Sequence, residues 1–205
     1  MYKIAQIIMI LLFAMAKGHA QKVEMQDGYV VFDATGLPAT AYEVRDENFA
    51  PGGRIPRHGP DSNAATKVSA KFRIAPTLCK PDGTPGRKGS TWAEAAGWNT
   101  SANSLPISET PQPAKTGCSQ YKGKDNLDSE IGKWRLPTVT ELKMIVIFAP
   151  VIENLGYREV LVNQWSATEF ATTQAYVNTL NYYVSVLPRT ATGNTTFARC
   201  IQDIR

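Results

Sequence analysis

The clearest hydrophobic pattern in the chain is a helical one that begins after Pro137. Its apolar positions recur at the spacing of one helix face, and they are Leu142, Ile145, Val146 and Ala149, with Ile147 and Phe148 widening the face. Thr138 and Glu141 stand three residues apart, as in a capping box, where the hydroxyl and the carboxylate each accept a backbone amide proton. The pattern therefore predicts a helix that starts at Val139, ends at Pro150 and packs against a sheet.

Alternation with period two predicts the strands. Residues 67 to 75 alternate apolar with charged or polar side chains, which is typical of a half-buried strand. Residues 29 to 32 form a β-rich tetrapeptide bounded by turn residues, which predicts one short strand. Three closely spaced runs near the end, at 175 to 180, 183 to 187 and 196 to 201, predict an antiparallel meander.

The remaining segments predict one short helix and two long loops. Ser90 or Thr91 can cap a helix over Trp92 to Ala96. Residues 50 to 63 are rich in Gly and Pro, which indicates an exposed loop or linker. Residues 99 to 131 contain few large aliphatic side chains, so we expect a long excursion that a disulfide at Cys118 tethers.

Residues 1 to 20 have the pattern of an export signal. A basic start at Lys3 precedes the apolar run Ile4 to Ala16, and Gly18-His19-Ala20 is a small-residue cleavage site. The alternative is a membrane anchor, which the short run disfavours because a bilayer needs ~20 apolar residues. We therefore expect an exported protein without a membrane span, divided into the signal at 1–20, an N-terminal extension at 21–66 and a domain at 67–205.

Charge and cysteine content narrow the function classes. Loss of residues 1 to 20 removes Lys3 and Lys17 and lowers the formal net charge from +4 to +2, which argues against nucleic acid as a partner. Cys79, Cys118 and Cys200 are the only cysteines. One disulfide and one thiol are the expected arrangement in an exported protein, and the sequence leaves all three pairings open.

The sequence contains few combinations of residues that are typical of an active site or a metal site. His19 falls in the signal and His58 in a loop, so a histidine-based triad has one candidate without marked neighbours. Asp125, Asp128 and Glu130 cluster as calcium ligands do, but a solvated loop is the favoured explanation for them. We expect no enzyme activity, no cofactor and no metal.

Four short motifs occur in an order that resembles the bacterial DUF1566-like (fibrobacter paralogous) domains. They are Thr91-Trp92-Ala93-Glu94-Ala95, Lys133-Trp134-Arg135-Leu136-Pro137-Thr138 with Glu141-Leu142, Trp165-Ser166-Ala167-Thr168-Glu169, and Ala198-Arg199-Cys200-Ile201-Gln202-Asp203. The resemblance covers about residues 70 to 205. Phe72 to Ala75 are also similar to the start of exported, fimbria-associated members from Bacteroidetes.

The resemblance implies an α+β protein with a C-type lectin-like domain, in which a twisted antiparallel sheet carries two helices and long loops. The last strand is then expected beside the first. Six motif residues are expected to be structural: Trp134, Arg135, Thr138, Glu141, Trp165 and Cys200. Arg135 is expected to donate hydrogen bonds to backbone carbonyls, because a buried guanidinium needs satisfied partners.

Recognition is the function that the remaining residues favour. Five side chains suit the binding of a protein or glycan, namely Tyr176, Asn178, Asn181, Tyr182 and Tyr183. The alternative without a ligand is that Tyr176 and Tyr183 are half-buried strand residues and that Asn181 and Tyr182 form a turn. We predict an adhesive or fimbria-associated protein of the cell surface or outer membrane, with a periplasmic location also open. The alternatives are an enzyme of the formylglycine-generating type, which needs paired reactive cysteines, and a purely structural envelope protein.

The export prediction has a direct test. Protein recovered from the exported fraction of an expressing bacterium is expected to begin at Gln21, because cleavage follows Ala20. Intact-mass measurement with N-terminal sequencing checks this. Recovery of the chain with residues 1 to 20 still attached contradicts it.

Overall fold

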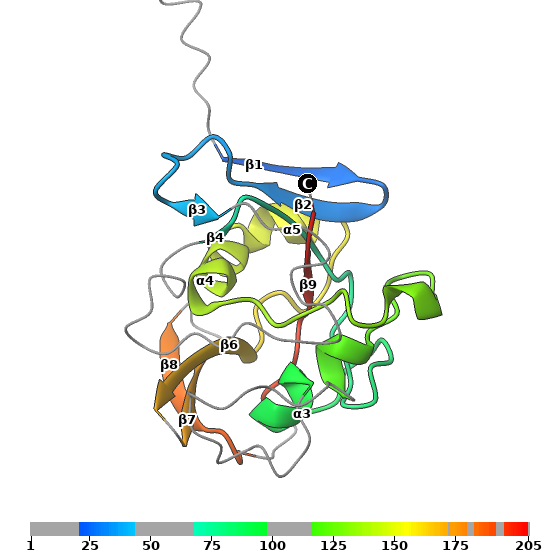
Figure 1. The fold of residues 1–205 in the computed structure, drawn as a ribbon, viewed down its shortest axis with the longest axis vertical. Coiled ribbons are helices and arrows are strands. Elements are labelled where there is room, and N and C mark those ends of the chain that lie inside the picture. The colour runs from blue at the N-terminus through cyan, green and yellow to red at the C-terminus, as the bar shows by residue number, and fades with distance from the viewer. Residues whose placement is uncertain are drawn as a thin grey trace, which may run out of the picture.

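The computed structural model describes residues 21–43, 68–97, 116–171, 173–179, 183–191 and 195–204. The predicted signal and the Gly- and Pro-rich loop at 50–63 lie outside these residues. Figure 1 shows a four-stranded sheet at one end of the molecule and a three-stranded sheet towards the other, with two helices beneath the first. The structure thus combines mostly antiparallel sheets with few helices, as the α+β prediction states.

The four-stranded sheet joins segments from both ends of the chain. Its order is β1-β2-β5-β9, and every neighbouring pair is antiparallel. The strands are β1 (Lys22–Gln26), β2 (Tyr29–Asp33), β5 (Lys71–Ile74) and β9 (Ile201–Asp203). The strand predicted at 29 to 32 is confirmed. Its partner β1 was not predicted, although Asp27 and Gly28, both with positive φ, form the kind of turn that joins hairpin strands.

The strand β9 corrects the predicted meander. Residues 175 to 180 and 183 to 187 do provide two antiparallel strands, β7 (Gln174–Asn178) and β8 (Val184–Pro188). The third strand of that sheet is β6 (Gln164–Ala171). β9 belongs to the four-stranded sheet instead, where it pairs with β5. β6 escaped prediction because its first six residues are all buried, so it shows no alternation.

The segment predicted as one strand over 67 to 75 is divided. β4 (Val68–Ser69) pairs in parallel with β3 (Tyr42–Glu43), and β5 begins after Ala70. The alternation is confirmed from Ala70 to Ile74, where Ala70, Phe72 and Ile74 are buried and the residues between them are half buried. It fails at β4, because Ser69 is buried as well as Val68.

Both predicted helices are present. α3 (Trp92–Ala96) and α4 (Val139–Ile147) each begin with a complete capping box, formed by Thr91 with Glu94 and by Thr138 with Glu141. The prediction that Pro150 ends the second helix is wrong. α4 already ends at Ile147, and Pro150 lies in the first turn of α5 (Ala149–Asn154), where a missing N–H costs nothing.

Two large apolar clusters, with a small third one of Leu78, Val162 and Phe197, form the core of the described residues. One lies where α4 and α5 cover the four-stranded sheet, and it includes Phe32, Phe72 and Ile145. The other contains three buried tryptophans, Trp92, Trp134 and Trp165. The indole nitrogen of Trp165 donates to Ser90 O over 2.9 Å, and that of Trp134 donates to Glu130 Oε2 over 3.0 Å, so these buried polar atoms are satisfied.

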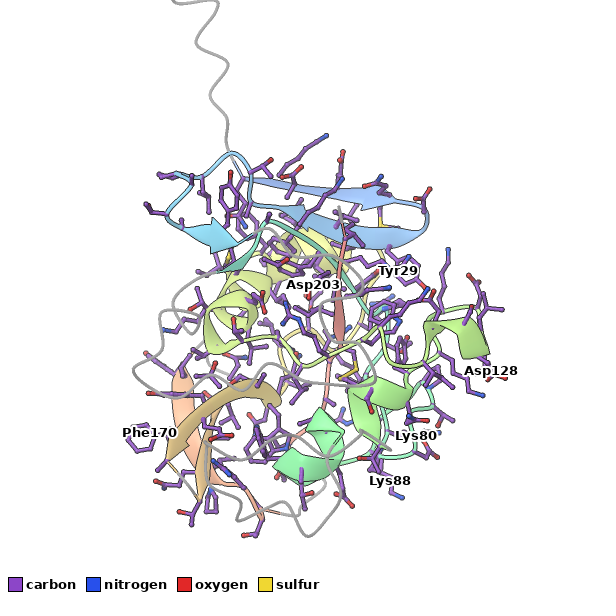
Figure 2. All side chains as sticks on the ribbon, in the orientation of Figure 1. Tyr29, Lys80, Lys88, Asp128, Phe170 and Asp203 are labelled. Carbon is purple, nitrogen blue, oxygen red and sulfur yellow. A yellow bond between two sulfur atoms is a disulfide. The ribbon has the colours of Figure 1, made fainter. Side chains whose placement is uncertain are left out.

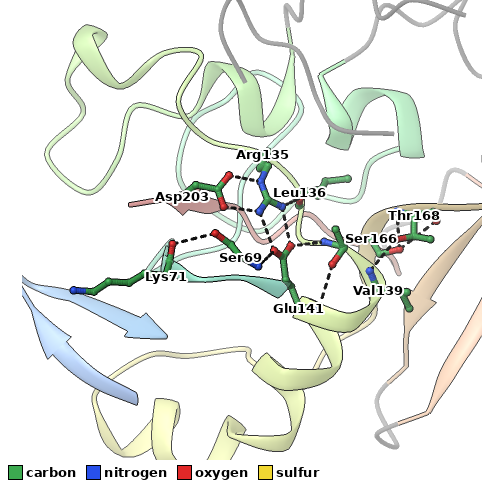
Figure 3. Close-up of polar contacts among 10 residues, drawn as sticks. Ser69, Lys71, Arg135, Leu136, Val139, Glu141, Ser166, Thr168 and Asp203 are labelled. Carbon is green, nitrogen blue, oxygen red and sulfur yellow. Dashed lines mark hydrogen bonds and ion pairs between the residues drawn. The ribbon is translucent and has the colours of Figure 1, made fainter. Parts of the chain in front are cut away.

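Arg135 is fully buried between two carboxylates (Figure 3). Nε and Nη2 donate to Asp203 over 2.8 and 2.6 Å, and Nη1 and Nη2 donate to Glu141 over 2.8 and 2.9 Å. The last N–H reaches Leu136 O over 3.1 Å. Burial lowers the pKa of Arg135, but the attraction of Asp203 and Glu141 outweighs burial and raises that pKa above its usual value. The expectation that Arg135 donates several hydrogen bonds to backbone carbonyls is therefore wrong, because only one of its bonds goes to a carbonyl and the others go to carboxylates.

The arginine that relies on carbonyls is Arg199. Its guanidinium is fully buried and donates to the backbone oxygens of Ala75, Arg158 and Glu159 over 2.9, 2.6 and 3.0 Å. Carbonyl dipoles compensate burial less completely than a carboxylate does. Burial accordingly lowers the pKa of Arg199 to about 10.

A disulfide joins Cys118 to Cys200 across 82 positions of sequence and leaves Cys79 as a free, buried thiol. Cys118 lies in the short 3-10 helix η3 (Gly117–Gln120), within the long predicted excursion, and a second such turn, η4 (Asp128–Glu130), follows. Closing a loop of this length stabilises the fold by about 4 kcal/mol in the chain-entropy picture. The predicted tether at Cys118 is confirmed.

Replacing Arg135 by Met is expected to lower the free energy of unfolding by about 3–5 kcal/mol, because Glu141 and Asp203 then keep buried charges without a counter-charge. Urea unfolding monitored by tryptophan fluorescence measures the loss. The matched control is Arg87→Met, which breaks a more exposed ion pair with Glu159 and should cost at most about 1 kcal/mol. Equal losses for the two variants contradict the assigned importance of the buried cluster.

Candidate functional site

A groove of about 330 Å³ lies between α4 and the strands β7 and β8. Three lining residues come from α4 and three from the two strands or the residue just before β8. They are Lys143, Val146, Ile147, Asn178, Tyr183 and Val184. Two of them, Asn178 and Tyr183, belong to the ligand-binding set predicted from the sequence.

Helix geometry places one side of α4 on the groove. Lys143, Val146 and Ile147 are spaced i, i+3 and i+4, so they share a face. The neighbouring face of α4 packs into the core through Ile145. We expected Ile147 to widen the buried face, but its side chain is 69% exposed and lines the groove instead. The sequence carried a signal for this, because Lys143 stands one turn before Ile147.

Strand alternation places Asn178 on the groove side of β7. Ala175 and Val177 point into the tryptophan core, so Tyr176 and Asn178 point to the other side of the sheet. Asn178 lies opposite Val184 of β8 and is only 1% exposed, because α4 packs against β7 there.

The Asn178 amide has no hydrogen-bond partner within the part of the chain that the structure describes, for either its nitrogen or its oxygen. A buried polar group left unpaired costs about 1–3 kcal/mol. Such groups are rare in folded proteins, and each one calls for an explanation. Ser90, Gln164 and Gln202 also carry an unpaired buried polar atom, but Asn178 is the one of these residues that lines the groove.

Apolar side chains stand at the rim of the same groove. Tyr183 is 72% exposed, and with Ile147 it is among the most exposed large apolar side chains of the described residues. Contiguous exposed apolar groups mark interaction sites more often than single ones do.

The other predicted ligand residues lie elsewhere. Tyr176 is half buried and packs edge-on against Phe170, with ring centroids 5.5 Å apart. Phe170 is 44% exposed and points away from the rest of the molecule (Figure 2). The Tyr176 ring thus belongs to an aromatic pair beside the groove and does not line it. Asn181 and Tyr182 lie outside the described residues.

Lys143 is the charged member of the groove lining, and sequence reasoning missed it. Its side chain is exposed. Among the described residues no carboxylate lies within ion-pair distance of its ammonium group. The groove therefore combines one positive charge, one amide and an apolar rim.

Glu169, whose role the sequence left open, lies on the core side of the three-stranded sheet. It forms a buried 2.8 Å ion pair with Arg189. The Arg189 guanidinium lies 4.8 Å from the centre of the Trp92 ring, a favourable cation–π arrangement. Both residues are fully buried, so we assign them a structural role.

Two of the three acidic residues considered as calcium ligands are engaged in ion pairs. Asp128 contacts Lys122 over 2.6 Å, and Glu130 contacts Arg73 over 2.9 Å. Within the described ranges no group of three or more His, Cys, Asp or Glu side chains is placed to hold a metal ion.

Comparison with protein-family models finds no match for the chain, and comparison with curated proteins finds none either. The helices of the described residues are all too short or too polar to cross a membrane.

The Cys79 thiol is expected to resist alkylation in the native protein. Its side chain is fully buried, and burial raises the pKa of the thiol above its usual value, so the reactive thiolate is suppressed. Iodoacetamide labelling with mass analysis, before and after unfolding in urea without reductant, should modify one cysteine only in the unfolded sample. Rapid native modification of Cys79 contradicts this assignment.

Proposed function

We propose that the protein is an exported, non-enzymatic binding protein of the cell surface, of adhesive or fimbria-associated type. The groove between α4 and the strands β7 and β8 is its recognition site. The observation that carries the proposal is the unpaired, buried amide of Asn178 in a groove whose rim exposes Tyr183. Aromatic side chains of this kind supply contact area at small entropic cost.

The fold proposed for this function is C-type lectin-like, within the DUF1566-like group. Support comes from the pairing of β9 with β5, which brings the last strand beside part of the strand predicted at 67 to 75. Arg135 adds to this support, because its backbone pairs with Ile201 and so joins the second motif to the fourth. A fold of this type hosts unrelated functions, so the groove carries the functional proposal.

The disulfide is compatible with the proposed export. Cys118 and Cys200 form a bond that persists in oxidising compartments and is rare in the cytosol. Together with the signal pattern at 1–20, it favours a location outside the cytosol.

Cysteine chemistry favours a binding protein over the formylglycine-generating alternative. That enzyme type needs two reactive cysteines in one place. Here Cys118 and Cys200 are bonded to each other, and the Cys79 thiol is buried with a raised pKa. The Cys79 thiol therefore forms little thiolate and is poorly accessible to solvent, whereas a reactive cysteine needs both.

The proposal is tested by measuring attachment of the fluorescently labelled protein, purified after expression of the full sequence, to bacterial and host cells. Tyr183→Ser is expected to weaken attachment at least about tenfold, since an aromatic anchor at a binding site often contributes 2 kcal/mol or more. Leu127→Ser removes another exposed apolar side chain, 51% exposed, outside the groove, and should leave attachment unchanged.

Two results contradict the proposal. Absence of attachment to every surface tested favours the purely structural envelope protein. Equal losses for Tyr183→Ser and Leu127→Ser place recognition elsewhere on the molecule.

A further inference from the structure

We propose that the groove binds an acidic sugar, meaning a pyranose ring that carries a carboxylate. Asn178, Lys143 and Tyr183 each contact a different part of that ring. This inference rests on the function proposed above, because it names the ligand class of the same site.

Asn178 selects for neighbouring hydroxyl groups. Its amide offers two donors and an acceptor, and neither heavy atom has a partner among the described residues. Adjacent sugar hydroxyls both donate and accept, so a pair of them satisfies the amide from both sides. An apolar ligand leaves the amide unpaired, and a bare cation uses only its oxygen. The low exposure of Asn178 strengthens the selection, because hydrogen bonds shielded from water are electrostatically stronger.

Lys143 selects for a negative charge on the ring. Among the described residues, the groove lining contains this one ammonium group and no acidic side chain. A neutral sugar leaves the ammonium to water, whereas a carboxylate on the ring forms a charge-assisted hydrogen bond with it.

The apolar part of the lining matches the C–H face of a pyranose. The ring of Tyr183 and the side chains of Ile147 and Val184 face the groove together with the polar groups. The groove volume of about 330 Å³ lies at the lower end of the roughly 300–1,000 Å³ typical of small-molecule sites, which suits one or two sugar rings. A peptide fits less well, because an extended main chain needs several polar partners along its length.

The binding test uses the purified protein, expressed from the full sequence, and three probes: glucuronate, galacturonate and glucose. Titrations followed by amide NMR shifts are expected to show millimolar binding of at least one uronate. Glucose should bind at least fivefold more weakly, and added salt should weaken uronate binding because it screens Lys143. Equal affinity for glucose and both uronates, or no shifts with any probe, overturns the inference.

A lysine variant isolates the charge. Lys143→Gln is expected to reduce uronate affinity to the level of glucose. Lys88→Gln removes an exposed lysine that lies away from β7 and β8 and should leave affinity unchanged (Figure 2). Equal losses in both variants indicate binding through the overall field of the protein and overturn the site.

An asparagine variant tests the amide with a readout other than binding. Asn178→Leu keeps the side-chain size and removes the unpaired polar atoms, so it is expected to raise Tm by about 2–4 °C while abolishing binding of the uronate. A lower Tm with unchanged uronate binding means that the amide serves the fold, which overturns its role as a ligand group.

The sugar inference and the proposed function fail in different ways. Attachment to cells that free uronate does not inhibit retains the function and overturns the sugar. Uronate binding that Asn178→Leu abolishes, in a protein that attaches to no surface, retains the groove as a sugar site and overturns the adhesive function.

Discussion

The structure depends on the pairing of one buried guanidinium with two buried carboxylates. Arg135 uses all its donors, and the carboxylates it contacts come from α4 and β9. Glu141 also accepts from the backbone N–H of Ser69 and of Thr138 over 2.9 and 2.8 Å. The cluster therefore fixes a strand, a helix start and the last strand at one point. Removing Arg135 leaves two buried carboxylates without a counter-charge, whereas removing one carboxylate leaves the guanidinium paired with the other.

The cluster positions the helix that forms one wall of the groove. Glu141 holds the first turn of α4, and Lys143 and Ile147 follow on the same rigid helix. The opposite wall is a pair of strands whose inner face packs on the tryptophan core. A site built on a helix and a sheet keeps its shape without ligand, so a ligand there meets little ordering cost. Among the described residues, Asn178 has both polar atoms of its buried amide unpaired, whereas Gln164 and Gln202 each leave one atom unpaired. Departures from full hydrogen bonding of this kind are expected at functional sites.

Local signals were enough to predict the starts of α3 and α4, the strand at 29 to 32 and the inward face of residues 67 to 75. They fail where the outcome depends on what packs against a segment. β6 is covered on both sides, so it lacks alternation, and Ile147 continues an apolar pattern yet faces solvent. The role of Arg135 was assigned to the wrong partners, because Asp203 lies 68 positions away and only the fold brings it near. Arg199 has the carbonyl partners expected for Arg135.

The placement of β9 has a consequence for the order of events during synthesis. β5 pairs with β9, and Phe72 lies opposite Asp203. An inner strand of the sheet therefore pairs with a strand that is synthesised more than a hundred positions later. The guanidinium cluster and the disulfide wait for the same C-terminal segment. Contacts of such long range form slowly and late. The four-stranded sheet, the guanidinium cluster and the disulfide are therefore completed only after that C-terminal segment has been synthesised.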